Sequence, residues 1–198
     1  MNSKSLTCAV CLLLGFALVL ATGALAHGPA PVHFSGLLND YSPSTVKGGP
    51  YEMRGIWSLD LHRESGTADF SAAMDMETSE FGITEGIVDP TQPATHGAHT
   101  HHIKLTHATV TWNMDGCPAF SPATKVGFQI NGTVRLMTGN GSIAPFETDP
   151  PSSTLQVCIT GGSGDFSVRY SNLTLVFQGP ATTHFGTQAI HGVVRRTR

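Results

Sequence analysis

Two neighbouring segments alternate apolar and polar residues with a period of two, and this strongly limits the fold. In residues 51–62 every second side chain is apolar or small. The side chains between them are polar, except Ile56, which is an apolar residue at a polar position. Residues 68–76 repeat the alternation, and the polar stretch 63–66, which contains a glycine, lies between the two runs. Because successive side chains of a strand point to opposite faces, the pattern predicts a β-hairpin with one buried face.

Similar alternation predicts further strands along the rest of the chain. They cover residues 32–38, 101–112, 125–137, 153–160, 165–177 and 188–194. The phase slips between Leu105 and Val110 and again at Ser171-Asn172, which is typical of β-bulges. No stretch carries a sustained helical stripe of apolar residues. The sequence therefore predicts one all-β domain of about nine strands, an antiparallel β-barrel or β-sandwich, with Trp57 and Trp112 in its core.

The first 26 residues have the pattern of a cleavable export signal. Lys4 precedes an apolar run over residues 8–20, and Ala24-Leu25-Ala26 matches a small-residue cleavage site. The run is short for a membrane span. We therefore expect residues 1–26 to be removed and residues 27–198 to form the single domain, without a membrane span. Such a protein is secreted, into a periplasm or outside the cell.

Two cysteines, Cys117 and Cys158, remain after such cleavage. In an oxidising compartment an even number of cysteines indicates a disulfide, so we expect these two to pair. Cys158 alternates with the apolar residues of its strand and would face the outside of the sheet. The disulfide would then hold the 114–124 loop against that outer face.

Charge and composition exclude several classes of protein. The chain has 11 Lys+Arg against 14 Asp+Glu, a formal net charge of −3, and charged residues make up only 13%. A nucleic-acid partner would call for a basic surface, and a coiled coil or disordered tail would call for more charge. The sequence contains no G-x-S-x-G, G-x-x-x-x-G-K-[ST] or H-E-x-x-H motif, so no enzyme class is indicated.

Histidine is the residue type that points to chemistry. Five of the ten histidines lie within residues 96–107, and His184 and His191 lie near the C-terminal end. His99 and His101 are two residues apart, so in a strand both project from one face. Two such imidazoles plus a third from another segment are a common zinc or copper site. We predict a metal site of His99, His101 and His184, with His191 as the fourth ligand or as a residue that orients the ligands.

Other interpretations stay open at this point. The histidines fit equally a solvent-exposed surface without a metal, and His102 would face away from His99 and His101 in any case. His33 and His62, each alone on a strand, are expected to be structural. The chain would then be a non-enzymatic binding module for a small apolar ligand, a sugar or a protein partner. A third interpretation is a cyclase- or isomerase-like barrel, in which a His or Glu inside the pocket acts as acid or base.

Three short stretches resemble known families. Residues 159–166, Ile-Thr-Gly-Gly-Ser-Gly-Asp-Phe, are similar to the Gly-Gly-x-Gly-x-Phe turn of allene oxide cyclase and dirigent-like barrels, which favours a barrel and implies no catalytic residue. A mature start at His27-Gly28 resembles bacterial lytic polysaccharide monooxygenases, which implies copper held by the imidazole and α-amino group of His27. Residues 99–103 with 184–195 resemble an uncharacterised family of secreted bacterial histidine-rich β-proteins, which implies no activity.

Overall fold

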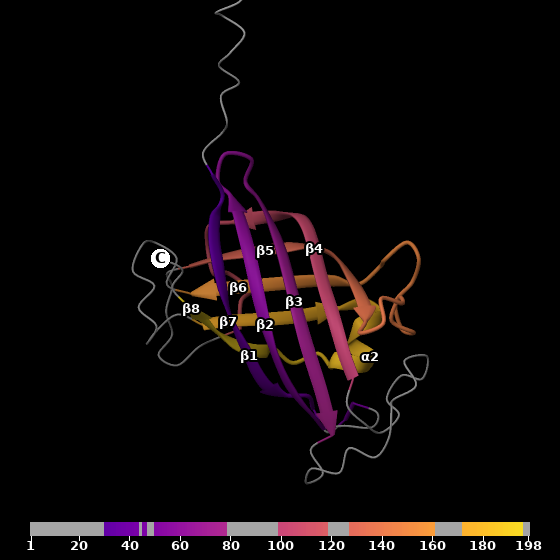
Figure 1. Cartoon of the computed structure of the whole chain (residues 1–198). Coiled ribbons are helices and arrows are strands. Elements are labelled where there is room, and N and C mark those ends of the chain that lie inside the picture. The colour runs from indigo at the N-terminus through magenta and orange to yellow at the C-terminus, as the bar shows by residue number, and fades with distance from the viewer. Residues whose placement is uncertain are drawn as a thin grey trace, which may run out of the picture. The chain divides into compact units, whose positions relative to one another are not determined.

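Eight strands form a closed antiparallel barrel in which each strand pairs with the next and β8 closes on β1 (Figure 1). The computed structural model describes residues 30–43, 45–46, 50–78, 99–118, 127–160 and 172–195. The chain divides into two compact units, Met1–Ala30 and Pro31–Arg198, and the eight strands lie in the second. The predicted all-β fold is confirmed, and of the two predicted architectures the chain adopts the barrel.

The strands follow one another around the barrel in chain order. They are β1 (Val32–Tyr41), β2 (Tyr51–His62), β3 (Thr67–Thr78), β4 (His99–Thr111), β5 (Gly127–Thr138), β6 (Thr154–Thr160), β7 (Asn172–Gln178) and β8 (Ile190–Arg195). A short 3-10 helix η1 (Gly179–Ala181) and the single turn α2 (Thr182–Phe185) connect β7 to β8. Within the described ranges, no helix is both long and apolar enough to cross a membrane.

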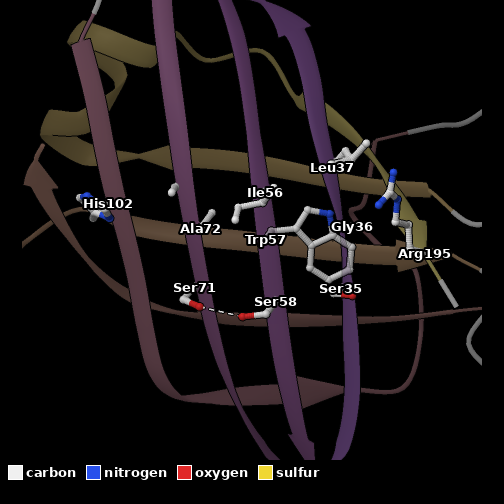
Figure 2. Close-up of a pocket in the computed structure, with 11 residues that line it drawn as sticks. Ser35, Gly36, Leu37, Ile56, Trp57, Ser58, Ser71, Ala72, His102 and Arg195 are labelled. Atoms are coloured by element: carbon white, nitrogen blue, oxygen red, sulfur yellow. Dashed lines mark hydrogen bonds between the residues drawn. The ribbon is translucent and has the colours of Figure 1, made fainter. Parts of the chain in front are cut away.

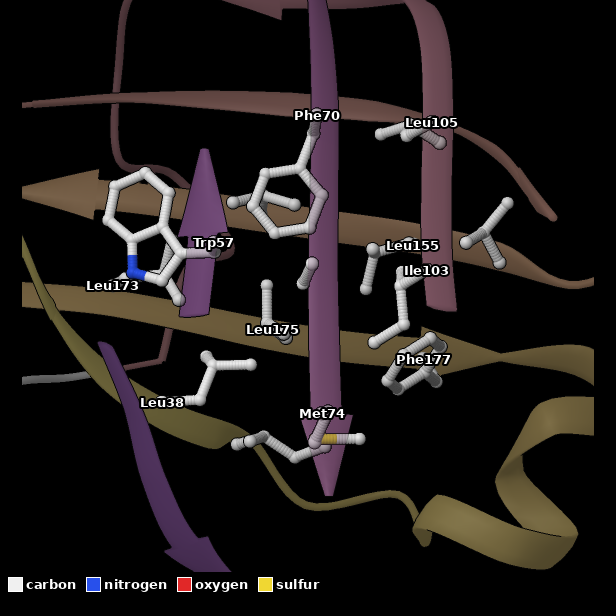
Figure 3. Packing of buried hydrophobic residues seen from close by; sticks show 14 of the residues in the cluster. Leu38, Trp57, Phe70, Met74, Ile103, Leu105, Leu155, Leu173, Leu175 and Phe177 are labelled. Carbon is white, nitrogen blue, oxygen red and sulfur yellow. The ribbon is translucent and has the colours of Figure 1, made fainter. Parts of the chain in front are cut away.

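The inward positions of the alternating strands fill the barrel interior. Trp57 is buried as predicted, and aliphatic and aromatic side chains from strands all around the barrel pack against one another (Figure 3). Ile56, which broke the alternation, lies outside and is 63% exposed. Burial of each large apolar side chain contributes about 1.5–3 kcal/mol, so this interior is the main source of stability.

The prediction that Trp112 is a core residue is wrong. Its side chain is 54% exposed, although its ring leans on Phe128 with the ring centroids 5.5 Å apart. β4 ends at Thr111, one residue earlier. The alternation that directs side chains inward therefore no longer applies at this position.

A β-bulge interrupts β4 where the phase of the alternation slips. The register of β4 shifts against both β3 and β5 near His107, whose φ is 50°. The backbone N–H of His107 donates to a carboxylate oxygen of Asp69 at 2.7 Å. This hydrogen bond, supported by His62, lowers the pKa of Asp69. The other predicted slip includes Ser171, which lies outside the described residues.

The predicted disulfide between Cys117 and Cys158 is confirmed. It joins the segment that follows β4 to the outward face of β6. Gln129, the neighbour of Cys158 on β5, donates through its side-chain amide to the carbonyl oxygen of Asp115 at 2.8 Å. The segment is therefore held on the outside of the barrel by one covalent bond and by hydrogen bonds.

One end of the barrel is built differently from the rest, because β5 extends beyond the start of β6. There the connection between these strands takes over the role of a pairing strand. The Glu147 carboxylate accepts the N–H of Leu136 at 2.8 Å, and the N–H of Ala144 donates to the carbonyl oxygen of Leu136 at 3.2 Å. Ser153 accepts the N–H of Ala181 at 3.0 Å, which ties η1 to the same connection. These contacts hold the α2 turn at this end.

Candidate metal centre

Strand β4 brings His99 and His101 to the interior at the end of the barrel where α2 lies. β4 begins at His99, and its alternation places His101 inside with Ile103 and Leu105. His101 is 2% exposed, whereas His99 is half-buried at the rim. The shared face that the sequence predicted for these two side chains is therefore the inner face of the barrel.

The third imidazole comes from α2, which passes next to the start of β4 (Figure 1). His184 is 3% exposed. The turn ends at Gly186, which has a φ of 81° and donates its N–H to the carbonyl oxygen of Thr182 at 3.0 Å. A Cβ atom at Gly186 would lie 2.8 Å from Cγ of Pro43, so the tight packing there requires glycine. This close fit fixes the C-terminal end of the turn that carries His184.

The three side chains converge through the same ring atom. The Nε2 atom of His184 lies 2.9 Å from Nε2 of His99 and 2.9 Å from Nε2 of His101. A neutral Nε2 carries either one proton or one lone pair, so that of His184 can make only one of these two hydrogen bonds. Its Nδ1 is buried without a hydrogen-bond partner. Hydrogen bonding among the rings therefore cannot satisfy both contacts at Nε2 of His184.

A cation between the three nitrogens would satisfy all of them at once. The candidate ligand atoms of His99, His101 and His184 all lie within 4.8 Å of one another. Zinc–imidazole bonds measure about 2.0–2.1 Å, so three nitrogens bound to one ion lie somewhat over 3 Å apart. Small movements of the side chains would therefore accommodate an ion, and the three residues are close enough to hold one.

Aromatic rings enclose the cluster. Phe146 stacks on His184 with ring centroids 4.8 Å apart and an interplanar angle of 18°. The ring centroids of Phe185 and His101 are 5.1 Å apart, and those of the fully buried Tyr51 and of His99 are 5.5 Å apart. Both pairs meet edge to face. These rings exclude water from the inner side of the cluster and restrict the rotamers of the imidazoles.

Burial keeps the two inner imidazoles neutral. Burial, with a smaller effect from the nearby His99, lowers the pKa of His184 to about 3. It also lowers the pKa of His101 well below its ordinary value, with repulsion from His184 and His99 adding to the effect. Metal ligation requires neutral imidazole, so His101 and His184 are ready to bind without first losing protons.

The structure does not bring His191 to this cluster. Its neighbour Ile190 points into the barrel, so the alternation of β8 directs His191 outward. Its Nδ1 lies 2.6 Å from a carboxylate oxygen of Asp40, and its backbone N–H donates to the same oxygen at 2.7 Å. His191 is therefore hydrogen-bonded to Asp40 on the outer surface of β8 and β1 and is not a neighbour of the three converging imidazoles.

The remaining histidines of the described part of the chain have surface positions. Nδ1 of His33 lies 2.8 Å from a carboxylate oxygen of Asp60, and Nε2 of His62 lies 3.3 Å from one of Asp69. His102 faces outward, opposite to His101, as predicted. His27 and His96 lie outside the described residues.

A separate pocket of about 470 Å³ opens on the outer surface of the barrel (Figure 2). The hydroxyl groups of Ser58 and Ser71 are joined by a 2.8 Å hydrogen bond at its wall. None of the three converging histidines lines it, and His102 does. Its lining is Ser35, Gly36, Leu37, Ile56, Trp57, Ser58, Ser71, Ala72, Ala73, His102 and Arg195. The pocket is thus independent of the candidate metal centre.

Sequence reasoning missed the aromatic side chains around the imidazoles. Tyr51 opens β2, and its inward parity was a usable indication of burial but not of contact with His99. Phe146 lies in an irregular connection, where no periodicity predicts the direction of a side chain.

Comparisons of the chain with known protein families, with curated proteins and with solved structures find no match. Its function must therefore be inferred from the geometry of the site.

Proposed function

We propose that this chain is an exported β-barrel protein that binds one zinc or copper ion through Nε2 of His99, His101 and His184. The observation that supports the proposal is the convergence of three imidazoles from β4 and α2. Both metals accept imidazole nitrogen, and three histidines are a common ligand set in zinc proteins.

Three protein ligands leave one coordination position for water or another molecule. The half-buried His99 lies at the rim, which gives an ion a route into the cluster, whereas His101 and His184 are enclosed. In enzymes such an open position supports hydrolysis or redox chemistry. The proposal here is limited to binding of the ion.

The proposed export is supported by the apolar run at 8–20, by Ala24-Leu25-Ala26 and by the disulfide, which is compatible with an oxidising compartment. Expression in an exporting bacterial host tests it. Intact-mass measurement of the protein from the periplasm or medium should give a chain that begins at His27. A full-length chain in the cytoplasm would contradict export without affecting the metal proposal.

Metal binding is tested with purified protein that has been stripped with a chelator and titrated with zinc and with copper. Wild-type protein should take up one equivalent, and His101→Ala should reduce the affinity by about 10–100-fold or more, since a ligand is at least as important as the residues that orient it. His102→Ala is the matched control, because it removes the adjacent imidazole on the other face of β4, and should bind like wild type. Absence of uptake by wild type, or equal uptake by the two variants, would contradict the proposal.

A further inference from the structure

Three methionines face the barrel interior on the strands next to the histidine cluster. Met53 lies on β2, and Met74 and Met76 lie on β3; all three are fully buried. Methionine carries the one soft, neutral sulfur ligand that an apolar interior tolerates without a charge.

The strand register pairs two of these methionines with two of the proposed ligands. Met74 is the direct cross-strand partner of His101, and Met76 is the direct partner of His99. The nearest register shift between β3 and β4 lies at Ala68/Phe70, well away from these pairs. Figure 3 shows Met74 close to the arrowhead of β3, the end of the strand that pairs with the start of β4.

Direct cross-strand partners share one face of the sheet, with Cβ atoms about 4.5–5.5 Å apart. Since His101 is buried inside the barrel, Met74 points to the same side, and the same holds for Met76 and His99. The flexible thioether side chain can extend along the strand or toward the neighbouring strand. Both methionine side chains therefore lie on the inner face of the sheet, directly beside two of the proposed ligands.

The charge of the surroundings also bears on the ion. In the described part of the chain, the group of side chains close enough to share a metal consists of three imidazoles, without a carboxylate or thiolate. A divalent ion would keep its full charge inside an aromatic shell. The solvation cost of a buried ion grows with the square of its charge, so a monovalent ion is much less costly there.

We propose that the site is selective for cuprous copper, and that a thioether from the Met74–Met76 pair joins His99, His101 and His184 as a ligand. This inference rests on the metal-binding function proposed above and goes beyond it by naming the ion and the further ligand. Thioether sulfur selects Cu(I) over zinc, and Cu(I) carries a single positive charge.

The ordinary alternative is that these methionines only fill space in the core. Leucine substitution separates the two roles, because Leu and Met have similar volumes and their exchange in a core costs less than about 1.5 kcal/mol. Leucine packs but provides no sulfur. Met53→Leu is the matched control, because Met53 is equally buried but pairs with Met76 and not with a histidine.

The experiment is an anaerobic competition of the metal-free full chain against the Cu(I) chelator bicinchoninate, with a parallel Zn²⁺ titration and thermal unfolding of each variant. The double variant Met74→Leu/Met76→Leu should bind Cu(I) at least about tenfold more weakly than wild type, with an unchanged affinity for Zn²⁺. Met53→Leu should match wild type for both ions. If the double variant does not fold, the two single variants replace it, and at least one must show the selective loss.

Each other outcome has a distinct meaning. Unchanged Cu(I) affinity in the double variant, an equal loss of Zn²⁺ affinity, or the same loss in Met53→Leu would overturn the methionine assignment. The proposed metal-binding function would survive these results, because the wild type would still bind through its histidines. If the wild type bound neither ion, the proposed function itself would fail and this inference would fail with it.

Discussion

The Nε2 atoms of His101 and His184 lie 2.9 Å apart, although 83 positions separate these residues in the sequence. One lies on β4 and the other in α2, so the contact exists only when the β7–β8 connection is folded against the barrel end. An ion held between these atoms would link the two segments. Metal binding and folding of this part of the chain should therefore be coupled.

The first prediction is that zinc or copper raises the thermal stability of the protein. A ligand present at about 100 times its Kd stabilises the folded state by roughly 2.7 kcal/mol, which corresponds to a rise in Tm of about 5–10 °C for a domain of this size. Differential scanning calorimetry of wild type and His184→Ala, each with and without metal, measures the shift. A similar shift in both proteins would show that the ion stabilises the chain from another site.

The second prediction concerns the metal-free protein in acid. An unfolded chain protonates its histidines below about pH 6.5. In the folded state the pKa of His184 is lowered to about 3 and that of His101 is lowered as well, so both side chains resist protonation. The unfolded state therefore binds more protons in this window, and the free energy of unfolding falls as the pH falls. Each of these two histidines lowers the free energy of unfolding by about 1.4 kcal/mol for every pH unit below the pKa of the unfolded chain.

Urea unfolding of the metal-free protein between pH 7 and pH 4 measures this slope. His184→Gln should reduce the slope by about the contribution of one histidine, because glutamine does not titrate. His102→Gln, which changes an exposed side chain on the same barrel, is the matched control. An identical pH dependence in wild type and His184→Gln would contradict the buried, neutral state of His184.

How far the sequence predicts this molecule depends on the level of structure. Period-two alternation predicted β2 to the residue and placed His99 and His101 on one face, because strand geometry alone determines which side chains share a side. It could not separate a barrel from a sandwich, since both bury alternate residues of antiparallel strands. Trp112 was assigned to the core because its parity continued beyond Thr111, where the strand ends.

The site was harder to predict than the strands. The sequence assigned His184 as a ligand and His191 as a fourth ligand or orienting residue, and what brings only His184 to the site is a single helical turn, too short to produce a periodic pattern. The ring that stacks on His184 belongs to Phe146, whose position follows from hydrogen bonds of Glu147 and Ala144 to Leu136. Such tertiary contacts produce no regular spacing of residues that can be recognised in the sequence.

The third prediction concerns Gly36 on β1, which packs against Trp57 and strand β8. A Cβ atom there would lie 1.8 Å from the carbonyl oxygen of Val193 and 2.6 Å from Nε1 of Trp57. These two groups are hydrogen-bonded to each other at 3.2 Å. Gly36→Ala should therefore force strands apart and lower the free energy of unfolding by about 2–3 kcal/mol or more.

Gly139→Ala is the control for this substitution, because the closest atom to its Cβ would be Cβ of Thr100 at an ordinary 3.4 Å. It should change stability by less than about 1 kcal/mol. Chemical denaturation of both variants gives the comparison. Equal stability of Gly36→Ala and wild type would mean that β1 and β8 do not approach as closely as described.

The fourth prediction concerns the disulfide, which closes a loop between residues 41 positions apart. Loop-closure entropy in the unfolded chain gives it a stabilising effect of about 4 kcal/mol. The variant Cys117→Ala/Cys158→Ala should lose about this amount in a denaturant titration, yet keep the affinity for metal, because the bond lies on the outside of β6. Loss of metal binding in a folded double variant would contradict the independence of the two features.

Anomalous X-ray scattering from crystals of the metal-loaded protein tests the central claim most directly. Data collected at the zinc or copper absorption edge should give one peak within about 2.0–2.1 Å of the Nε2 atoms of His99, His101 and His184. A peak at another group of residues, or none in crystals grown with excess metal, would contradict the proposal that these three histidines bind an ion.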